Sequence, residues 1–110
     1  MVRYIAGLVI LIAVASYGAY SASASLKYRE AGAIEYNWQA ALTFCERQQS
    51  RLPSILELAG LMYRGVLVQP ATDYWSRTAL FGYAFGANTK SYILSFDRFS
   101  DIDHVVCVRD

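Results

Sequence analysis

The stretch from Tyr4 to Tyr20 contains no charged residue, and Arg3 just before it is a single cation. As an α-helix this stretch would be about 25 Å long, close to the ~30 Å hydrocarbon core of a bilayer. Its aliphatic residues would cover every face of the helix, so the small remainder of the chain could not bury it. The block therefore predicts export or membrane insertion, and it leaves the residues that follow to form the folded domain.

The residues 1–24 have two possible fates. In the first they are a secretory signal peptide, in which Ala22 to Ala24 supply the small residues of a cleavage site after Ala24. In the second they are a single-pass membrane anchor, with Tyr17 and Tyr20 at the far interface and the membrane bound through Tyr4 to Tyr20. Both place the domain outside the cytoplasm: in the periplasm, at the cell surface, or anchored to the membrane and facing outward.

The composition of the chain excludes several other classes of protein. Nine Tyr, five Phe and two Trp supply a core that disordered chains lack, and only two Pro and seven Gly exclude a collagen-like or low-complexity chain. Lys and Arg total 10 against 9 Asp and Glu, and one of the cations, Arg3, precedes the apolar block. The domain therefore has no surplus of positive charge for phosphates, and no nucleic-acid partner is expected.

Cys45 and Cys107 are the only cysteines. An even pair of cysteines in a small exported domain usually forms a disulfide. By chain entropy such a bond would contribute about 4 kcal/mol, which is comparable with the whole stability of a domain of this size. The chain has no C-x-x-C motif, and one His with two distant Cys does not make a zinc site, so neither redox activity nor a metal centre is expected.

Two helices are predicted, over residues 37–48 and 54–63. Asn37 can cap the first helix, and Ser54 with Glu57 forms the capping-box pattern of the second. The first helix has apolar residues at helical spacing on one face: Trp38, Ala41, Leu42 and Cys45.

Short strands are predicted in the second half of the chain, and residues 80–88 are either a strand with bulges or a hairpin. Residues 27–34 have no clear period, so they are either a linker, assigned to 25–33, or a first edge strand. This order predicts an α+β fold with two helices packed on a small antiparallel sheet, preceded by an N-terminal hydrophobic helix. The predicted strands are 74–79, 80–88, 91–97 and 103–109.

Four blocks occur in a fixed order: W-Q-A-A-L-T-F-C from Trp38, R-L-P-S-I-L-E-L from Arg51, Y-W-S-R-T from Tyr74 and V-C-V-R from Val106. Together they resemble the bacterial C-type-lectin-like domains that cap invasin- and intimin-type adhesins. The resemblance covers residues 34–110 and implies a C-type-lectin-like fold, with a disulfide from the first helix to the last strand. It implies an exported, non-enzymatic binding module, either an accessory adhesin or a subunit of a bacterial surface or envelope assembly. Its partner would be a protein or another cell-surface ligand.

The chain departs from the C-type lectins that bind sugar through calcium. Those proteins use E-P-N or Q-P-D in a long loop and W-N-D on a following strand, whereas here Gln69-Pro70 is followed by Ala71 and W-N-D does not occur. Asp101 and Asp103 alone would make a poor calcium cage. Calcium-dependent sugar binding is therefore not expected, nor is any cofactor.

The motif residues are expected to be structural. Trp38 and Trp75 are expected in the core. Arg51, Glu57 and Arg109 either form an internal ion pair or cap, or are surface charges. The full set of motif residues is Trp38, Arg51, Leu52, Pro53, Ser54, Glu57, Trp75 and Arg109.

Tyr83, Phe85 and Tyr92 are candidates for an exposed aromatic binding surface, with packing inside the domain as the alternative. His104 is expected to be a surface residue, and no nucleophile is paired with it by motif, so no enzyme is expected.

A competing interpretation is a single-pass membrane structural protein, in which the N-terminal helix assembles in a membrane complex and the domain is a plug or spacer.

Overall fold

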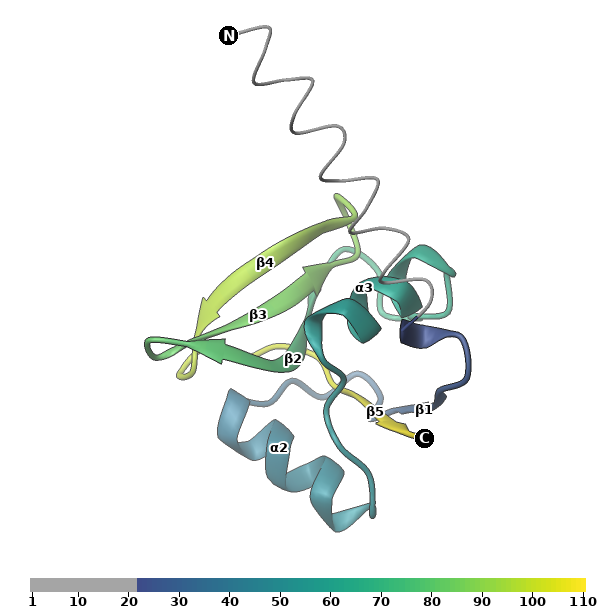
Figure 1. Cartoon of the computed structure of the whole chain (residues 1–110). Coiled ribbons are helices and arrows are strands. Elements are labelled where there is room, and N and C mark those ends of the chain that lie inside the picture. Colours follow the sequence, from purple (N-terminus) through teal and green to yellow (C-terminus); the bar gives the residue numbers. More distant parts are fainter. Residues whose placement is uncertain (1–21) are drawn as a thin grey trace, which may run out of the picture.

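The structure is a computed structural model that describes residues 22–110 (Figure 1). These residues form two helices and two antiparallel sheets, one with the strand order β1-β5 and one with the order β2-β3-β4. The fold is therefore α+β with two helices and small antiparallel sheets, as predicted. The elements are β1 (Lys27–Glu30), α2 (Trp38–Arg47), α3 (Ile55–Tyr63), β2 (Asp73–Leu80), β3 (Tyr83–Asn88), β4 (Ile93–Arg98) and β5 (Val106–Arg109).

The apolar block and the predicted N-terminal helix lie outside the described residues. Of the helices from residue 22 onward, none combines the length and the apolar character that crossing a bilayer requires.

Strand β1 settles the choice that the sequence left open for residues 27–34. It pairs antiparallel with β5, with Lys27 opposite Arg109 and Glu30 opposite Val106. The segment 25–33 is therefore not simply a linker, because it contains a strand of the domain. The sequence of β1 lacks the alternation of apolar and polar residues that predicts a strand, because three of its four residues are charged. A strand at the edge of a sheet can carry such residues, since it exposes most of its side chains.

Both helices begin at the caps that the sequence predicts. The Asn37 side chain accepts a hydrogen bond from the backbone N–H of Ala40 at 2.9 Å. The Ser54 hydroxyl accepts from the backbone N–H of Glu57, and the Glu57 carboxylate accepts from the backbone N–H of Ser54 at 2.8 Å. These bonds satisfy donors that the first turn of a helix cannot satisfy itself, which fixes where α2 and α3 start.

Strands β2, β3 and β4 form a meander. Phe81 and Gly82 connect β2 to β3, and both have positive φ, as a two-residue hairpin turn requires. Gly86 lies in the middle of β3, where an added Cβ would come within 2.3 Å of the Tyr74 carbonyl oxygen and 2.6 Å of the Ser95 hydroxyl. Only glycine allows this approach, and the pairing of β2 with β3 is irregular next to it.

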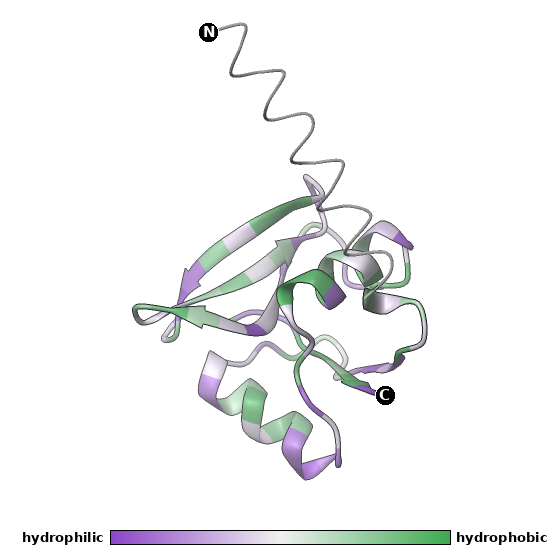
Figure 2. Ribbon diagram, in the orientation of Figure 1, coloured by the Kyte–Doolittle hydropathy of each residue, from purple (hydrophilic) through white to green (hydrophobic). Residues whose placement is uncertain are grey.

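Strand β5 separates two apolar clusters. Cys107 and Val105 face the α2 cluster, whereas Val106 and Val108 face the α3 cluster, because successive side chains of a strand point to opposite sides. The hydropathy colouring shows α3 and β5 as largely hydrophobic and the C-terminal end of α2 as hydrophilic (Figure 2). The buried members of the α2 cluster are Ala41, Cys45, Leu52, Trp75, Ala84, Val105 and Cys107. Those of the α3 cluster are Leu58, Leu61, Met62, Tyr74, Ala87, Val106 and Val108.

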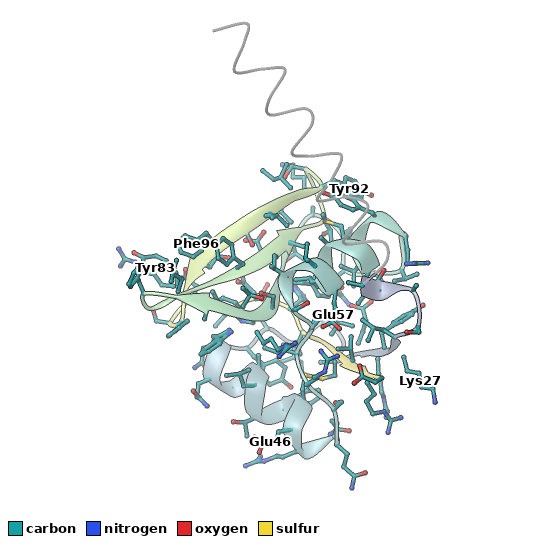
Figure 3. The ribbon with its side chains drawn as sticks, viewed as in Figure 1. Lys27, Glu46, Glu57, Tyr83, Tyr92 and Phe96 are labelled. Carbon is teal, nitrogen blue, oxygen red and sulfur yellow. A yellow bond between two sulfur atoms is a disulfide. The ribbon has the colours of Figure 1, made fainter. Side chains whose placement is uncertain are left out.

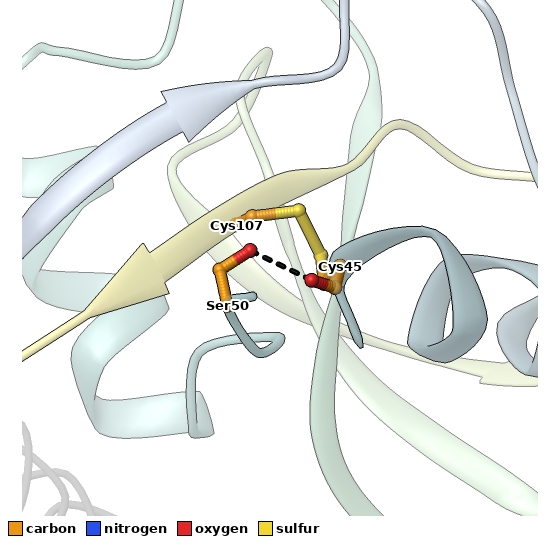
Figure 4. Close-up of a disulfide and its surroundings, with 3 residues drawn as sticks. All are labelled: Cys45, Ser50 and Cys107. Atoms are coloured by element: carbon orange, nitrogen blue, oxygen red, sulfur yellow. Dashed lines mark hydrogen bonds between the residues drawn. A yellow bond between two sulfur atoms is a disulfide. The ribbon is translucent and has the colours of Figure 1, made fainter. Parts of the chain in front are cut away.

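The predicted disulfide is present. Cys45 at the C-terminal end of α2 is bonded to Cys107 in β5, with 5.4 Å between their Cα atoms and a sequence separation of 62 (Figure 4). Beside it, the Ser50 hydroxyl donates a hydrogen bond of 2.8 Å to the Cys45 carbonyl oxygen. Both cysteines are buried in the α2 cluster, so the bond ties this helix to the strand that both clusters share.

We predict that the double variant Cys45→Ala, Cys107→Ala loses about 4 kcal/mol of unfolding free energy, because its unfolded chain is no longer cross-linked. Thermal and urea unfolding of the full-length variant and the oxidised wild type, followed by circular dichroism, measure this difference. An unchanged melting temperature would contradict the structural role of the bond. So would free thiols in protein taken from its native location.

Candidate functional site

The four sequence blocks meet in one junction. The backbone of Arg51 exchanges two hydrogen bonds with Val108 of β5, at 3.1 and 2.8 Å. The backbone N–H of Arg77 donates to the Pro53 carbonyl at 2.8 Å. The segment between the helices therefore links β2 to β5, and the motif residues of these blocks have a structural role.

Arg51 forms the ion pair that the sequence left open. Its guanidinium makes two parallel hydrogen bonds with the Glu57 carboxylate, at 2.7 and 3.0 Å, and a third of 2.9 Å with Asp110. The hydrogen bond from Arg51 holds the pKa of Glu57 below its usual value, although burial opposes this shift. The second carboxylate bound to Arg51 belongs to Asp110. Arg109 is exposed and is not part of this ion pair.

Both tryptophans pack inside the domain, as predicted. Trp75 is fully buried, and its indole N–H donates to the Tyr36 carbonyl at 2.6 Å. Trp38 is half-buried; its ring stacks on Phe99 with centroids 4.2 Å apart, and its N–H donates to the Ser76 carbonyl at 2.9 Å. Neither indole is free to act as a ligand platform, because both donors are satisfied within the domain.

Two of the three aromatic candidates share a face of the sheet. Tyr83 and Phe85 lie on one face of β3, and both rings contact Phe96 of β4, at 4.9 and 4.7 Å between centroids. Leu94 lies two residues from Phe96 on the same face. We call these four residues the aromatic face. Phe96 and Leu94 remain 46% and 49% exposed, because α3 packs on β2 and β3 rather than on β4.

Tyr92 is separate from the aromatic face. It precedes β4 in the β3–β4 connection with a φ of 56°, and Figure 3 shows it at the opposite end of the sheet from Tyr83. The sequence pattern placed Tyr92 with Leu94 and Phe96 by strict alternation. The strand begins only at Ile93, so alternation does not extend to Tyr92.

The outer edge of β4 is unpaired among the described residues, since β4 ends the strand order of its sheet. Its first half is hydrophobic in Figure 2, and Ile93 is exposed there as well as Leu94. Exposed, apolar edge strands are uncommon in isolated domains because they attract other strands. This edge and the aromatic face together form a surface suited to binding another chain.

A hollow of about 360 Å³ lies beside the disulfide. Lys27, Arg29 and Arg109 line it from paired positions of β1 and β5, and Phe44 and Gln48 of α2 contribute to its wall. Glu30 also lines the hollow, so its walls carry both signs of charge with an excess of positive charge.

His104 is not the surface residue that the sequence predicts. It is buried against Tyr74, with ring centroids 5.8 Å apart, because its backbone pairs with β2. Its Nδ1 lies 2.9 Å from the Thr72 hydroxyl and 3.8 Å from a Glu35 carboxylate oxygen. Both groups approach the same ring nitrogen, whereas a nucleophile relay needs the hydroxyl on one nitrogen and the carboxylate on the other. The contact between His104 and Thr72 therefore ties the Thr72 loop to the segment before β5.

Sequence reasoning missed a group of carboxylates. Asp73, Asp97 and Asp103 each place a carboxylate oxygen within 4.8 Å of the other two. We call them the acidic triad. The sequence singled out only Asp101 and Asp103, because the other members come from two strands whose proximity no local pattern reveals. Burial is the main cause that raises the pKa of both Asp97 and Asp103.

Comparison of the chain with models of known protein families and with curated protein sequences gives no match.

We predict that Glu57→Gln lowers the unfolding free energy by about 1–2 kcal/mol near pH 7, because Arg51 loses its charged partner. The pKa of Glu57 in the folded protein is below its usual 4.5, so the contribution is complete above about pH 5 and is lost as pH falls through the folded value. Urea unfolding across this range should show the two curves converging in acid.

The matched control is Asp110→Asn, which removes the other partner of Arg51. Asp110 is largely exposed, so this change should cost about 0.5 kcal/mol or less. Equal losses for the two variants, or a Glu57→Gln difference that persists at about pH 2, would refute the internal ion pair.

Proposed function

We propose that this chain is an exported, non-enzymatic binding module with a C-type-lectin-like fold, which acts as an accessory adhesin or a subunit of a bacterial surface or envelope assembly. The observation that carries the proposal is the aromatic face beside the free edge of β4. Contiguous apolar surface of this kind marks interaction sites in soluble domains.

The partner is a polypeptide, because β4 offers a row of backbone groups that another extended chain can complete. A strand added at this edge would receive backbone hydrogen bonds from β4. Phe96 and Leu94 would pack against its side chains, and aromatic residues commonly dominate such contacts.

The C-type-lectin-like part of the proposal is supported by the junction of the four blocks. The resemblance implies that the first helix is bonded to the last strand, and the disulfide agrees with this implication. The pairing of Arg51 with Val108 brings a second block against the same strand.

The proposal of a non-enzymatic module is supported by the contacts of the cysteine and histidine side chains. Both cysteines are in the disulfide, and the one histidine binds Thr72 and Glu35 through a single ring nitrogen.

A retained membrane anchor is the second candidate, because Ser23 belongs to the packed domain. Ser23 is only 4% exposed, and its hydroxyl accepts a hydrogen bond of 2.7 Å from Arg64. Leu26 packs against the α3 cluster nearby. Cleavage after Ala24 would remove Ser23 from this contact, so the packing favours a chain that keeps its N-terminus, as the plug or spacer of a membrane complex would.

We predict that a photo-crosslinking amino acid at position 96 of the full-length chain, expressed in its native host, forms one dominant product with a single protein. The double variant Leu94→Ser, Phe96→Ser should weaken binding of that partner at least about tenfold. It should still fold at the assay temperature, as circular dichroism would show, because both side chains are half exposed and only part of their packing is lost.

The matched control is Val68→Ser with the crosslinker placed at position 68, because Val68 is exposed in the loop before β2 and belongs neither to β4 nor to the aromatic face. Equal crosslinking from positions 68 and 96, or unchanged affinity in the double variant, would refute the binding surface. Mass spectrometry of the native N-terminus separates the two fates: Ser25 first indicates a free module, and Met1 or Val2 indicates a retained anchor.

A further inference from the structure

The acidic triad joins three separate parts of the fold. Asp73 begins β2, Asp97 lies in β4, and Asp103 lies in the connection that leads to β5. Asp97 neighbours Phe96 in β4, so its side chain points to the opposite side of the sheet from the aromatic face. Ser95 shares the side of Asp97, two residues away.

Three buried oxygen atoms in this region have no partner. Within residues 22–110, the buried side-chain oxygens that lack a hydrogen bond are Ser95 Oγ, Asp97 Oδ2 and Asp103 Oδ2. Asp103 is only 7% exposed. Buried polar groups in native proteins are nearly always satisfied, so several unsatisfied acceptors on one side of a sheet call for a ligand that they share.

No basic side chain of the described residues pairs with the acidic triad. The ion pairs of Arg51 are made with Glu57 and Asp110 instead. The amide of Asn88 donates to Asp73 at 2.6 Å, and Asp97 is within hydrogen-bonding contact of Asp73 and Asp103. Three carboxylates so close together repel one another, and partial burial strengthens that repulsion. Either protons or a cation must neutralise them.

We propose that the acidic triad and the Ser95 hydroxyl bind a hard divalent cation, with Ca²⁺ as the preferred ion. Every candidate ligand atom is an oxygen, and carboxylate oxygens with a hydroxyl are ligands that Ca²⁺ accepts in irregular geometry. Mg²⁺ demands a nearly ideal octahedron, which three carboxylates from three separate segments are less suited to provide.

The cation would brace the fold rather than hold a sugar. It would connect the first residue of β2 to β4 and to the segment before β5, all on the side of the sheet away from the aromatic face. The cation site is therefore independent of the proposed polypeptide-binding surface, and an experiment that refutes one of them does not refute the other.

The test uses the full-length chain in detergent, stripped with a chelator and then titrated with Ca²⁺ alone. Calorimetry should show about one ion per chain, and about 10 mM Ca²⁺ should raise the melting temperature by roughly 5 °C or more. Asp103→Asn and Asp97→Asn should abolish both effects. In chelator these two variants should melt at or above the wild-type temperature, because they relieve repulsion among the carboxylates.

Glu46→Gln is the matched control, since it removes a carboxylate from an exposed position at the end of α2 (Figure 3), a helix that contributes no residue to the triad. It should keep the full response to Ca²⁺. If either Asn variant fails to fold, the other one carries the comparison. No response of the wild type to Ca²⁺, Mg²⁺ or Mn²⁺ would overturn the proposal and indicate carboxylates that share protons. A response that persists in the folded Asn variants would also overturn it.

Discussion

The covalent link between α2 and β5 is the constraint on which the rest of the domain depends. Strand β5 contributes to both apolar clusters and pairs with β1, so its position decides whether either cluster can close. The link fixes that strand against α2 from one side, and the backbone pairing of Arg51 with Val108 fixes it from another. A domain this small buries a limited apolar area, and a cross-link compensates for that limit.

The helices were predictable from the sequence because local chemistry determines them. The capping hydrogen bonds join residues within one helical turn of each other: they are made by Asn37, Ser54 and Glu57. The spacing of the apolar residues identifies the buried face of each helix. The disulfide was also predictable, but for a different reason: the chain has two cysteines, so each has one possible partner. The helix caps depend on residues that are close in sequence, and the disulfide depends on a residue type that occurs only twice in the chain.

The failed and missing predictions all involve pairing across long sequence distances. Strand β1 has no apolar pattern because it lies at an edge, and only its pairing with β5 makes it a strand. His104 is buried because its backbone joins β2, and the acidic triad forms only when β2, β4 and the following connection meet. Of the aromatic candidates, Tyr83 and Phe85 are half-buried against Phe96, whereas Tyr92 is exposed and lies apart from them because β4 begins only at Ile93.

The pairing of β1 with β5 has a consequence for how the molecule forms. The first strand of the described domain pairs only with its last strand, so during synthesis β1 has no strand partner until β5 has left the ribosome. Contacts of such high sequence separation slow folding, because a long loop must close before the hydrogen bonds between the two strands can form. The domain therefore closes late in synthesis, when nearly all of its residues are available.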